Sequence, residues 1–429
     1  MAPFINAARK QGIELFLLSS RSVLGLPSDV PGTTFDAASF DIARNTVLEV
    51  ALNEHRQRPF NGIIATDDAT THLAAAVAPS LSLKCNTKES VQLTRDKLMG
   101  RKRLKSAGLP CPEFICLDAR TACTSSATVN DNLLSTDNLP AFPLVVKPLS
   151  LSASRGVIRV DNRGDLETAL RRIARLLEKE FIDPDYRVLV ESYIPGFEVA
   201  VEGLLLNGKL HTLAVFDKPE PLTGPYFEET FYTTPSRLSN DILDQLIQRI
   251  GEVLDAFGLS EGPIHAECRI NDAGIWLVEV ASRTIGGRCG QLLELATGLS
   301  LEDIVISHAL GEEPMIRPIS GGAGVLMVPV PSSGVVRRVE GISDARRVAN
   351  VVAVDLDVST GQVLQAWPEG GSYPGFIFSC AGNAHDAEMA LRRAHQAIRI
   401  IVAPLLESGL KASEGRQDKA NGRENAQIT

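Results

Sequence analysis

Two acidic residues, Glu267 and Glu279, stand where two alternating apolar runs predict a β-hairpin. The runs cover residues 264–270 and 275–280, and Asn-Asp-Ala-Gly at 271–274 separates them. A three-residue loop with its glycine in the left-handed position would bring Glu267 opposite Glu279, with Cβ atoms about 4.5–5.5 Å apart. Two such carboxylates repel each other unless a cation lies between them. Because Mg²⁺ is held by one or two carboxylates together with phosphate oxygens and water, the pair indicates a metal–nucleotide site.

The neighbours of this pair extend the argument. The same register puts His265 opposite Ala281, and Arg283 follows the second strand with a fixed positive fork that could hold a phosphoryl or acyl-phosphate oxygen. A two-residue turn is the alternative reading. It would place Glu267 and Glu279 on opposite faces as ordinary solvated side chains.

Phosphate-binding residues are predicted further upstream. Lys147 ends an apolar strand, an unusual place for a lysine unless its ammonium meets an anion. The loop at residues 150–156 offers small residues, backbone N–H groups and the hydroxyls of Ser152 and Ser154, which suit it to covering phosphates. A plain hairpin loop is the alternative. Lys97, inside a predicted helix, would by itself be a surface lysine.

The composition bounds the class of protein. A chain of 429 residues, 44% hydrophobic and 22% charged, fits two or three globular domains. A net charge of −9 argues against nucleic acid as a partner, so the basic run at residues 101–103 is interpreted as a solvated helix face. Seven cysteines without a CxxC pair favour a reducing cytoplasm over a disulfide or zinc framework. No apolar run is long enough to span a membrane.

The elements that must position these residues follow from periodicity. The N-terminal part alternates helix and strand, which implies a parallel sheet flanked by helices. The predicted elements here are residues 3–11 (helix), 12–18 (strand), 40–55 (helix) and 62–65 (strand). The last strand runs into Asp67 and Asp68, which either contact a ligand or cap the next helix. The chain opens on a helix, where such a unit usually opens on a strand.

The rest of the chain predicts an antiparallel sheet region followed by a smaller unit. Helices are expected at residues 87–108, 165–177, 241–257 and 385–402. Residues 122–138 are predicted to be an exposed insertion. The predicted divisions are 1–86 (N-terminal α/β), 87–315 (central domain), 316–405 (C-terminal subdomain) and 406–429 (disordered tail).

In their order and spacing, these motifs resemble the ATP-grasp superfamily and, within it, the carboxylate–amine ligases similar to L-amino acid ligases. The motifs are Lys97, Lys147, the small-residue loop, Glu191-x-x-Ile194-x-x-x-Glu198, Glu267, Glu279 and Arg283. The resemblance covers nearly the whole chain. It implies a parallel α/β N-terminal domain, an ATP-grasp domain whose two antiparallel sheets hold ATP, and a C-terminal α/β subdomain.

The resemblance also implies roles for single residues. Lys97 and Lys147 would contact the ATP phosphates, together with Ser152 and Ser154. In the nucleoside part, Glu191 and the backbone of Tyr193 and Ile194 would bind adenine, and Glu198 the ribose hydroxyls. The metal ligands for Mg²⁺, or Mn²⁺ in its place, would be Glu267 and Glu279. The catalytic residues would be Arg283 and Lys147.

One position departs from the family pattern, because Ala281 stands where many members have Asn, and this puts a second Mg²⁺ in doubt. Either His265 or a water fills the gap, or His265 orients the substrate, or it is simply a packed histidine. The loop with Gly286 and Gly287 would let backbone approach a ligand. Arg288 is a candidate clamp for a substrate carboxylate, with a surface salt bridge as the alternative.

The implied activity is an ATP-dependent ligase that forms an amide or peptide bond through an acyl-phosphate and releases ADP and phosphate. Its substrates would be a small carboxylate and an amine, with amino acids the expected pair. The protein is expected to act in the cytoplasm, without nucleic acid or membrane partners, and a homodimer would fit the family. One alternative is an ATP-grasp enzyme with another acceptor, such as a phosphoribosyl amine or bicarbonate. The other is a nucleotide-binding protein without turnover.

Overall fold

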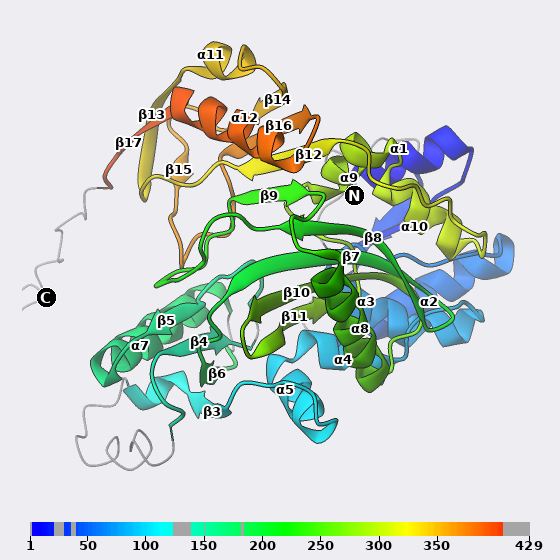
Figure 1. Cartoon of the computed structure of the whole chain (residues 1–429). Coiled ribbons are helices and arrows are strands. Elements are labelled where there is room, and N and C mark those ends of the chain that lie inside the picture. The colour runs from blue at the N-terminus through cyan, green and yellow to red at the C-terminus, as the bar shows by residue number, and fades with distance from the viewer. Residues whose placement is uncertain are drawn as a thin grey trace, which may run out of the picture.

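The computed structural model describes residues 2–20, 30–35, 40–122, 139–149, 151–181 and 184–405 (Figure 1). The described chain forms a small N-terminal unit, a four-stranded sheet, an eight-stranded sheet and a three-stranded sheet. The insertion predicted at residues 122–138, apart from its first residue, lies outside the described residues. The tail predicted over residues 406–429 lies outside them as well.

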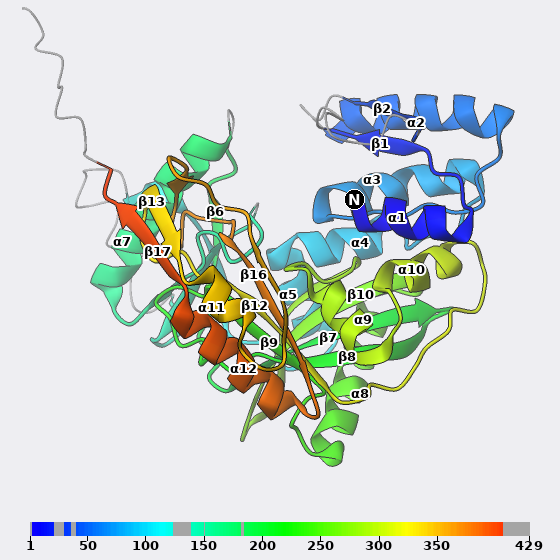
Figure 2. The same ribbon diagram turned by 90° about the horizontal axis from the view of Figure 1, so that it is seen from above.

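The N-terminal unit packs helices on a parallel pair of strands. Its elements are α1 (Ala2–Gln11), β1 (Leu17–Ser19), β2 (Gly32–Thr34), α2 (Phe40–Gln57), α3 (Asp68–Val77) and the 3-10 helix η1 (Ala78–Leu81). Leu17 pairs with Gly32 in parallel register, so the predicted parallel α/β arrangement is confirmed, with two strands among the described residues. Figure 2 shows α1 lying beside α10 (Leu301–Ala309), and the two helices share an apolar cluster.

Two strand predictions in this unit are wrong. Residues 62–65 have no strand partner in the described chain, and the strand predicted over residues 12–18 is confined to Leu17–Ser19. The physical reason is packing, because Ile64 lies against the cluster of Ala7, Ala8 and Ile306. Its apolar side chain is partly buried against helices, so an apolar run that packs on helices was misidentified as a strand.

The helix predicted over residues 87–108 is in fact two helices, α4 (Lys88–Arg95) and α5 (Lys97–Ser106). Asp96 lies between them with extended backbone, and its carboxylate accepts hydrogen bonds from the N–H groups of residues 98 and 99. An aspartate in this role starts a new helix and so ends the previous one. Lys97 is therefore the first residue of α5.

The four-stranded antiparallel sheet has the order β3-β6-β4-β5. Its elements are β3 (Phe114–Asp118), the 3-10 helix η2 (Ala119–Ala122), β4 (Leu144–Pro148), β5 (Ile158–Val160) and β6 (Arg187–Ser192). One face is covered by α7 (Arg163–Glu180), whose buried leucines and isoleucine recur at helical spacing. Because side chains alternate along a strand, Val145, Lys147 and Glu191 lie on the opposite face.

The eight-stranded sheet has the order β11-β10-β7-β8-β9-β12-β16-β14. Its strands are β7 (Phe197–Leu206), β8 (Lys209–Asp217), β9 (Phe231–Thr234), β10 (Gly262–Asn271), β11 (Gly274–Ala281), β12 (Gly322–Met327), β14 (Val351–Leu356) and β16 (Gly375–Ala381). α8 (Asn240–Phe257) packs on the alternate residues of β7 and β10 that include Val199, Val201 and Ile264. α9 (Cys289–Thr297) and α10 share a second apolar cluster with Ala200 and Phe216.

The C-terminal unit is joined to this sheet, since β12, β16 and β14 extend it beyond β9. A separate three-stranded sheet has the order β15-β13-β17, with β13 (Gly334–Glu340), β15 (Val363–Leu364) and β17 (Arg399–Ala403). Its helices are α11 (Ile342–Arg346) and α12 (Ala384–Ala397). The helix predicted to reach residue 402 stops early, because the β-branched run at residues 400–402 forms β17 instead.

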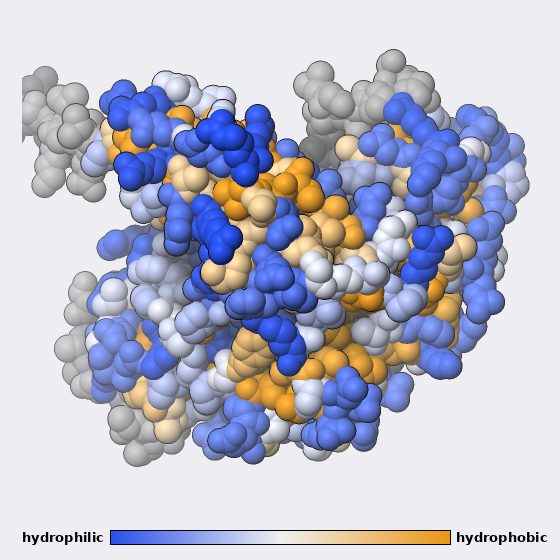
Figure 3. Space-filling model, turned by 45° about the horizontal axis from the view of Figure 1, so that its top comes forward, coloured by the Kyte–Doolittle hydropathy of each residue, from blue (hydrophilic) through white to orange (hydrophobic). Residues whose placement is uncertain are grey.

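Figure 3 shows a face of the molecule covered mainly by hydrophilic residues, with hydrophobic residues gathered in patches between them. In the described ranges, every helix is too short or too polar to cross a bilayer. The division into domains at residues 86 and 315 stays a prediction. It cuts the connection between β9 and β12, although these strands share one sheet.

Candidate functional site

The β10–β11 hairpin brings the two acids together as predicted. Glu267 pairs with Glu279 and His265 with Ala281. The loop, however, has two residues rather than three, because Asn271 already pairs with Gly274. A β-bulge between residues 267 and 268 leaves one residue of β11 unpaired and shifts the register. The bulge therefore restores the pairing that a two-residue loop alone would have lost.

A cavity between the two antiparallel sheets gathers most of the predicted site. Both sheets contribute to its wall, β4 and β6 from the smaller one and β7, β10 and β11 from the larger one. The lining includes all ten residues predicted for ATP and metal: Lys97, Lys147, Ser152, Ser154, Glu191, Tyr193, Ile194, Glu198, Glu267 and Glu279. Residues more than 180 positions apart thus meet in one cleft.

At one end of the cavity, Lys147 is held by a buried carboxylate. Its ammonium lies 2.5 Å from Glu191, whose side chain is 2% exposed. Burial lowers the pKa of Lys147, against the effect of Glu191. Burial tends to raise the pKa of Glu191, yet Arg101 and Lys147 together lower it to about 2. Glu191 is therefore ionised and fixes the direction of Lys147, and its predicted contact with adenine stays a prediction.

Arg101 is a residue that the sequence analysis assigned to a solvated face, and this assignment is wrong. It is buried and forms a bidentate pair with Glu191, at 2.7 and 3.2 Å. Its two terminal nitrogens donate to the carbonyls of Leu277 and Val278, each at 3.0 Å. These carbonyls belong to the bulge of β11, so Arg101 ties the bulge to the smaller sheet. A signal was present in the sequence, because Arg101 lies three residues from both Leu98 and Leu104 on the buried face of α5.

The loop after β4 faces the same end of the cavity. Lys97 donates to the carbonyl of Leu151 at 3.0 Å, which fixes the start of the loop. Ala153 and Ser154 both have φ of 55°, a left-handed conformation that costs energy for residues with a side chain. The hydroxyl-bearing Ser152 and Ser154 line the cavity, whereas Ser150 lies outside the described residues.

Arg269, which also lines the cavity, organises the residues predicted to bind the nucleoside. It is buried and donates to Glu198, to the carbonyl of Ile194 and to the carbonyl of Leu222, at 2.7 Å each. Its guanidinium also lies 5.1 Å from the ring centroid of Tyr193. The sequence analysis missed Arg269, although it lies two residues after Glu267 and therefore on the same face of the predicted strand. The roles predicted for Tyr193, Ile194 and Glu198 stay predictions.

Lys218 lies at the centre of an acidic cluster formed by Glu198, Glu229 and Glu267. Its ammonium is 2.7, 2.6 and 2.9 Å from the three carboxylates, respectively. Burial tends to lower the pKa of Lys218, but the carboxylates raise it well above its ordinary value. Burial, with Glu267 next in effect, raises the pKa of Glu229 to about 7. The lysine therefore supplies the charge that lets acids gather here.

Glu279 differs from the other acids of the cavity. In the part of the chain that the structure describes, its side chain makes no hydrogen bond or ion pair. Burial lowers the pKa of Lys147, and the charge of Glu279 acts against this lowering. A carboxylate that faces Glu267 across the strands and keeps its oxygens available suits a divalent cation. The donor set therefore fits the predicted Mg²⁺ ligands.

His265 lies behind this pair. One ring nitrogen is 3.3 Å from Glu267 and the other 3.6 Å from Glu202. Burial tends to lower the pKa of His265, but its two acidic neighbours raise it to about 9. The buried Glu202 in turn accepts the N–H of Ile285 at 3.1 and 3.2 Å. His265 is thus a packed, hydrogen-bonded histidine, and its predicted role toward a substrate or metal stays a prediction.

Arg283 reaches across to the N-terminal unit. Its guanidinium forms a bidentate pair with Asp68, at 2.8 and 3.0 Å. Asp67 instead caps α3 by accepting the N–H of Thr70. The capping alternative therefore holds for Asp67, whereas Asp68 orients Arg283. Arg283 is absent from the lining of the cavity, and its catalytic role stays a prediction.

The loop that follows Arg283 leads to the edge of the large sheet. Gly287 has φ of 60°, a backbone conformation that is strained for residues with a side chain, and an added Cβ would lie 2.8 Å from the sulfur of Met327, whose side chain would have to move. Next to Gly286 an added Cβ would meet open space. Arg288 pairs with Asp355 at 2.9 Å and stacks on Phe378. The salt-bridge alternative for Arg288 is therefore what the structure contains.

Comparison with known proteins agrees with this architecture. Residues 140–291 match the family described as the ATP-grasp domain, and residues 326–403 match L-amino acid ligase C-terminal domain 2. The chain is 19% identical to an L-arginine-specific L-amino acid ligase from Bacillus subtilis, over 83% of each protein. It is 23% identical to dapdiamide A synthase from Enterobacter agglomerans, over 78% of each protein.

A solved structure has the same fold over almost the full length. The L-amino acid ligase from Bacillus licheniformis superimposes with a TM-score of 0.78 at 24% identity, covering 93% of this chain and 95% of the other. The two sheets, the paired acids between them and the C-terminal match all point the same way. The chain belongs to the ATP-grasp superfamily, among the carboxylate–amine ligases similar to L-amino acid ligases.

Proposed function

We propose that this protein uses Mg·ATP to join the carboxylate of one amino acid to the amine of another, releasing ADP and phosphate. The observation that carries the proposal is the opposed pair Glu267 and Glu279, which lies in one cavity with Lys97 and Lys147. Carboxylates for a cation and ammonium groups for phosphates are the two charge types that a metal–nucleotide complex requires.

The cavity has an end suited to each part of ATP. Lys97, Lys147 and the Ser152–Ser154 turn supply positive charge and hydroxyl groups for phosphate oxygens. At the opposite end, Tyr193 and Ile194 offer backbone and apolar surface for the adenine, near Glu198 for the ribose. Because Glu191 and Glu198 are each paired with two cations, they act chiefly by orienting those cations.

Glu267 and Glu279 would hold the divalent cation, Mg²⁺ or Mn²⁺. When bound there, the cation neutralises charge on the phosphates and orients them for in-line attack. Ala281 provides no further oxygen ligand, and the facing His265 is already engaged by Glu202 and Glu267. We therefore propose a single protein-held cation, with the remaining ligands drawn from phosphate oxygens and water.

The chemistry needs two balanced steps. An oxygen of the substrate carboxylate attacks the γ-phosphorus, the bond to the bridging oxygen breaks, and ADP leaves. The amine nitrogen then attacks the acyl carbon of the acyl-phosphate, phosphate leaves with the bonding electrons, and the proton lost by the nitrogen passes to the released phosphate. Lys147 and Arg283 stabilise negative charge on the transferred group, and positioning supplies most of the rate.

The substrate side lies beyond Arg283. Gly286, Gly287 and Arg288 belong to the loop that follows Arg283. The N–H of Ile285 in this loop donates to Glu202, which also contacts His265. We propose that the acid substrate binds along this loop, with Arg288 exchanging Asp355 for the substrate carboxylate. The relatives named as amino acid ligases support amino acids as the substrate class.

Calorimetry with Mg·ATP, beside a phosphate-release screen over amino acid pairs, tests the proposal. The expected result is ATP binding, phosphate release that requires both an acid and an amine, and a dipeptide detected by mass spectrometry. Glu279→Gln should abolish release, and Glu89→Gln, an exposed change on α4, is the matched control. Release that requires bicarbonate or a phosphoribosyl amine instead would identify another acceptor. Binding without release under any pair would mean a non-catalytic nucleotide-binding protein.

A further inference from the structure

The loop that faces the phosphate end of the cavity is held by a distant part of the chain. The indole N–H of Trp367 donates to the carbonyl of Ala153 at 3.2 Å. The N–H of Gly156 donates to the carbonyl of Pro368 at 2.9 Å, and Arg155 donates to the carbonyl of Glu369 at 3.3 Å. Figure 1 shows the chain after β15 reaching down to the small sheet where these contacts form.

The segment of residues 367–369 has a firm base. Trp367 is 5% exposed, packs with Val330, Val336 and Leu364, and lies 4.9 Å from the ring centroid of Tyr373. The side chain of Glu369 forms an ion pair with Arg172 of α7. The segment therefore connects the C-terminal core both to the loop and to the helix that covers the small sheet.

The loop needs such support because of its backbone. Ala153 and Ser154 adopt left-handed φ values of 55°, which are strained for residues with a side chain and persist only where neighbours impose them. Three hydrogen bonds join this loop to residues 367–369, which lie outside the small sheet. Ser152 and Ser154, on either side of the carbonyl that Trp367 holds, both line the cavity.

We propose that residues 367–369 form a latch by which the C-terminal domain positions the Ser152–Ser154 turn over the phosphates. Trp367 acts as a positioning residue, because it contacts the loop backbone and is absent from the cavity lining. The proposal rests on the proposed function, since it assigns the phosphates of ATP to this end of the cavity. It gives the C-terminal domain a part in nucleotide binding, although that domain supplies no lining residue of this cavity.

The test uses the two tryptophans of the chain. Trp367→Phe removes the indole N–H and keeps an aromatic ring against Tyr373. Trp276→Phe is the matched control, because its indole donates to Asn271 at the hairpin turn, away from the loop. Both variants and the wild type are titrated with Mg·ATP and with adenosine by calorimetry. Without nucleotide, trypsin cleavage after Arg155 is followed by mass spectrometry.

Loss of one hydrogen bond should raise the rate of cleavage after Arg155 about fivefold in Trp367→Phe and leave Trp276→Phe unchanged. Mg·ATP should bind Trp367→Phe about fivefold more weakly, with unchanged affinity for adenosine, because the proposed function assigns the loop to the phosphates. Equal cleavage rates in all three proteins, or equal weakening of ATP and adenosine, would overturn the latch. If Trp367→Phe is cleaved faster after Arg155 but the wild type binds no ATP, the proposed function is overturned. The role of Trp367 in holding the loop would then still stand.

Discussion

Replacing Arg101 by methionine should lower the free energy of unfolding by about 3–5 kcal/mol, because it removes one partner of a buried ion pair and leaves the charge of Glu191 less well compensated. Arg101 is 5% exposed, and its guanidinium makes two hydrogen bonds to Glu191 and two to carbonyls of the β11 bulge. Methionine fills much of the same volume without any donor. Glu191 would keep Lys147 alone as its charged partner.

The assay is a thermal melt at neutral pH under one scan rate. A loss of 1 kcal/mol lowers the melting temperature of a domain of 150–250 residues by about 2–4 °C, so Arg101→Met should melt on the order of 10 °C below the wild type. Arg101→Lys should fall between the two. It keeps the charge, but a single ammonium cannot replace a fork that donates to Glu191 and to the bulge at once.

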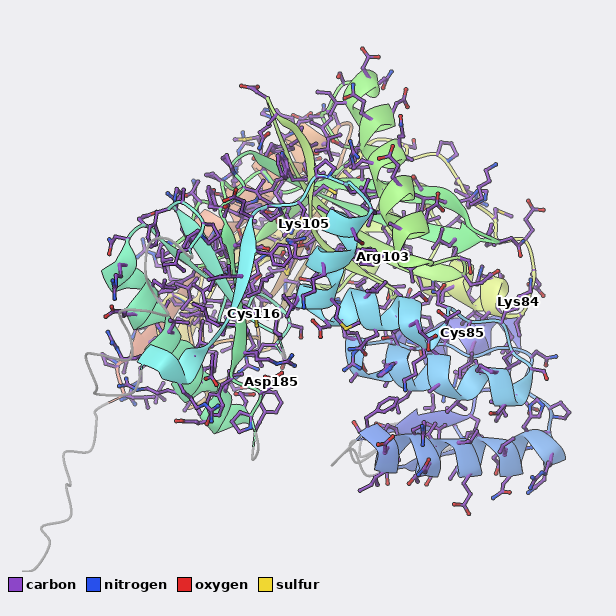
Figure 4. All side chains as sticks on the ribbon, turned by 90° about the horizontal axis from the view of Figure 1, so that it is seen from below. Lys84, Cys85, Arg103, Lys105, Cys116 and Asp185 are labelled. Atoms are coloured by element: carbon purple, nitrogen blue, oxygen red, sulfur yellow. The ribbon has the colours of Figure 1, made fainter. Side chains whose placement is uncertain are left out.

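Arg103→Met is the matched control, because Arg103 lies two residues from Arg101 but on the exposed face of α5 (Figure 4), where it donates to the carbonyl of Ala256. An exposed substitution usually changes stability by no more than about 0.5 kcal/mol, so this variant should melt within about 2 °C of the wild type. If Arg101→Met also melts within 2 °C of the wild type, the interpretation of Arg101 as the tie between the sheets is refuted.

Three further outcomes are expected. Glu279→Gln should raise the Mg²⁺ concentration needed for half-maximal ATP binding by about tenfold or more, because it removes one of two opposed carboxylates. Asp68→Asn should lower kcat about tenfold at unchanged KM for ATP, since Arg283 loses its bidentate partner; Asp67→Asn, which keeps a capping side chain, should leave kcat unaltered. Burial, with Arg95 next in effect, lowers the pKa of His72 to about 4. Below pH 6.5 the histidine is protonated in the unfolded chain but stays neutral in the folded one, so protonation favours unfolding. The melting temperature of the wild type should therefore fall between pH 6.5 and pH 4, and His72→Gln should lack this contribution to the fall.

The hairpin shows how far the sequence could be followed. Alternation of apolar residues predicted both strands, and the pairing of Glu267 with Glu279 is correct. The loop length is wrong, since two residues rather than three make the turn. The difference is absorbed by a bulge whose carbonyls are bound by Arg101, about 176 positions away in the chain. Local periodicity carries no information about a contact between residues so far apart in the chain. The predicted pairing is therefore correct, although the turn length from which it was predicted is wrong.

Buried charges were the other limit. Arg101 and Arg269 were assigned to no site, because a charged residue in a single sequence is by default a solvated one. Each is nevertheless buried against carboxylates that the sequence analysis did select. The acids were identified by motif, but the cations that compensate their buried negative charge are contributed by other segments of the chain. A predicted cluster of buried acids should therefore itself have indicated that buried cations were to be sought.

The pairing of charges in the cavity also explains why one acid stands apart. Glu191 is matched by Arg101 and Lys147, Glu198 by Lys218 and Arg269, and Glu267 by Lys218 and His265. Fixed cations offset the charge of these three carboxylates before any ligand arrives, so they hold the walls of the cavity in place and keep Glu267 opposite Glu279. Glu279 has no such partner within the described chain. Under the proposed function, Glu279 is the carboxylate available for a cation that enters with the nucleotide, and its charge would couple metal binding to ATP binding.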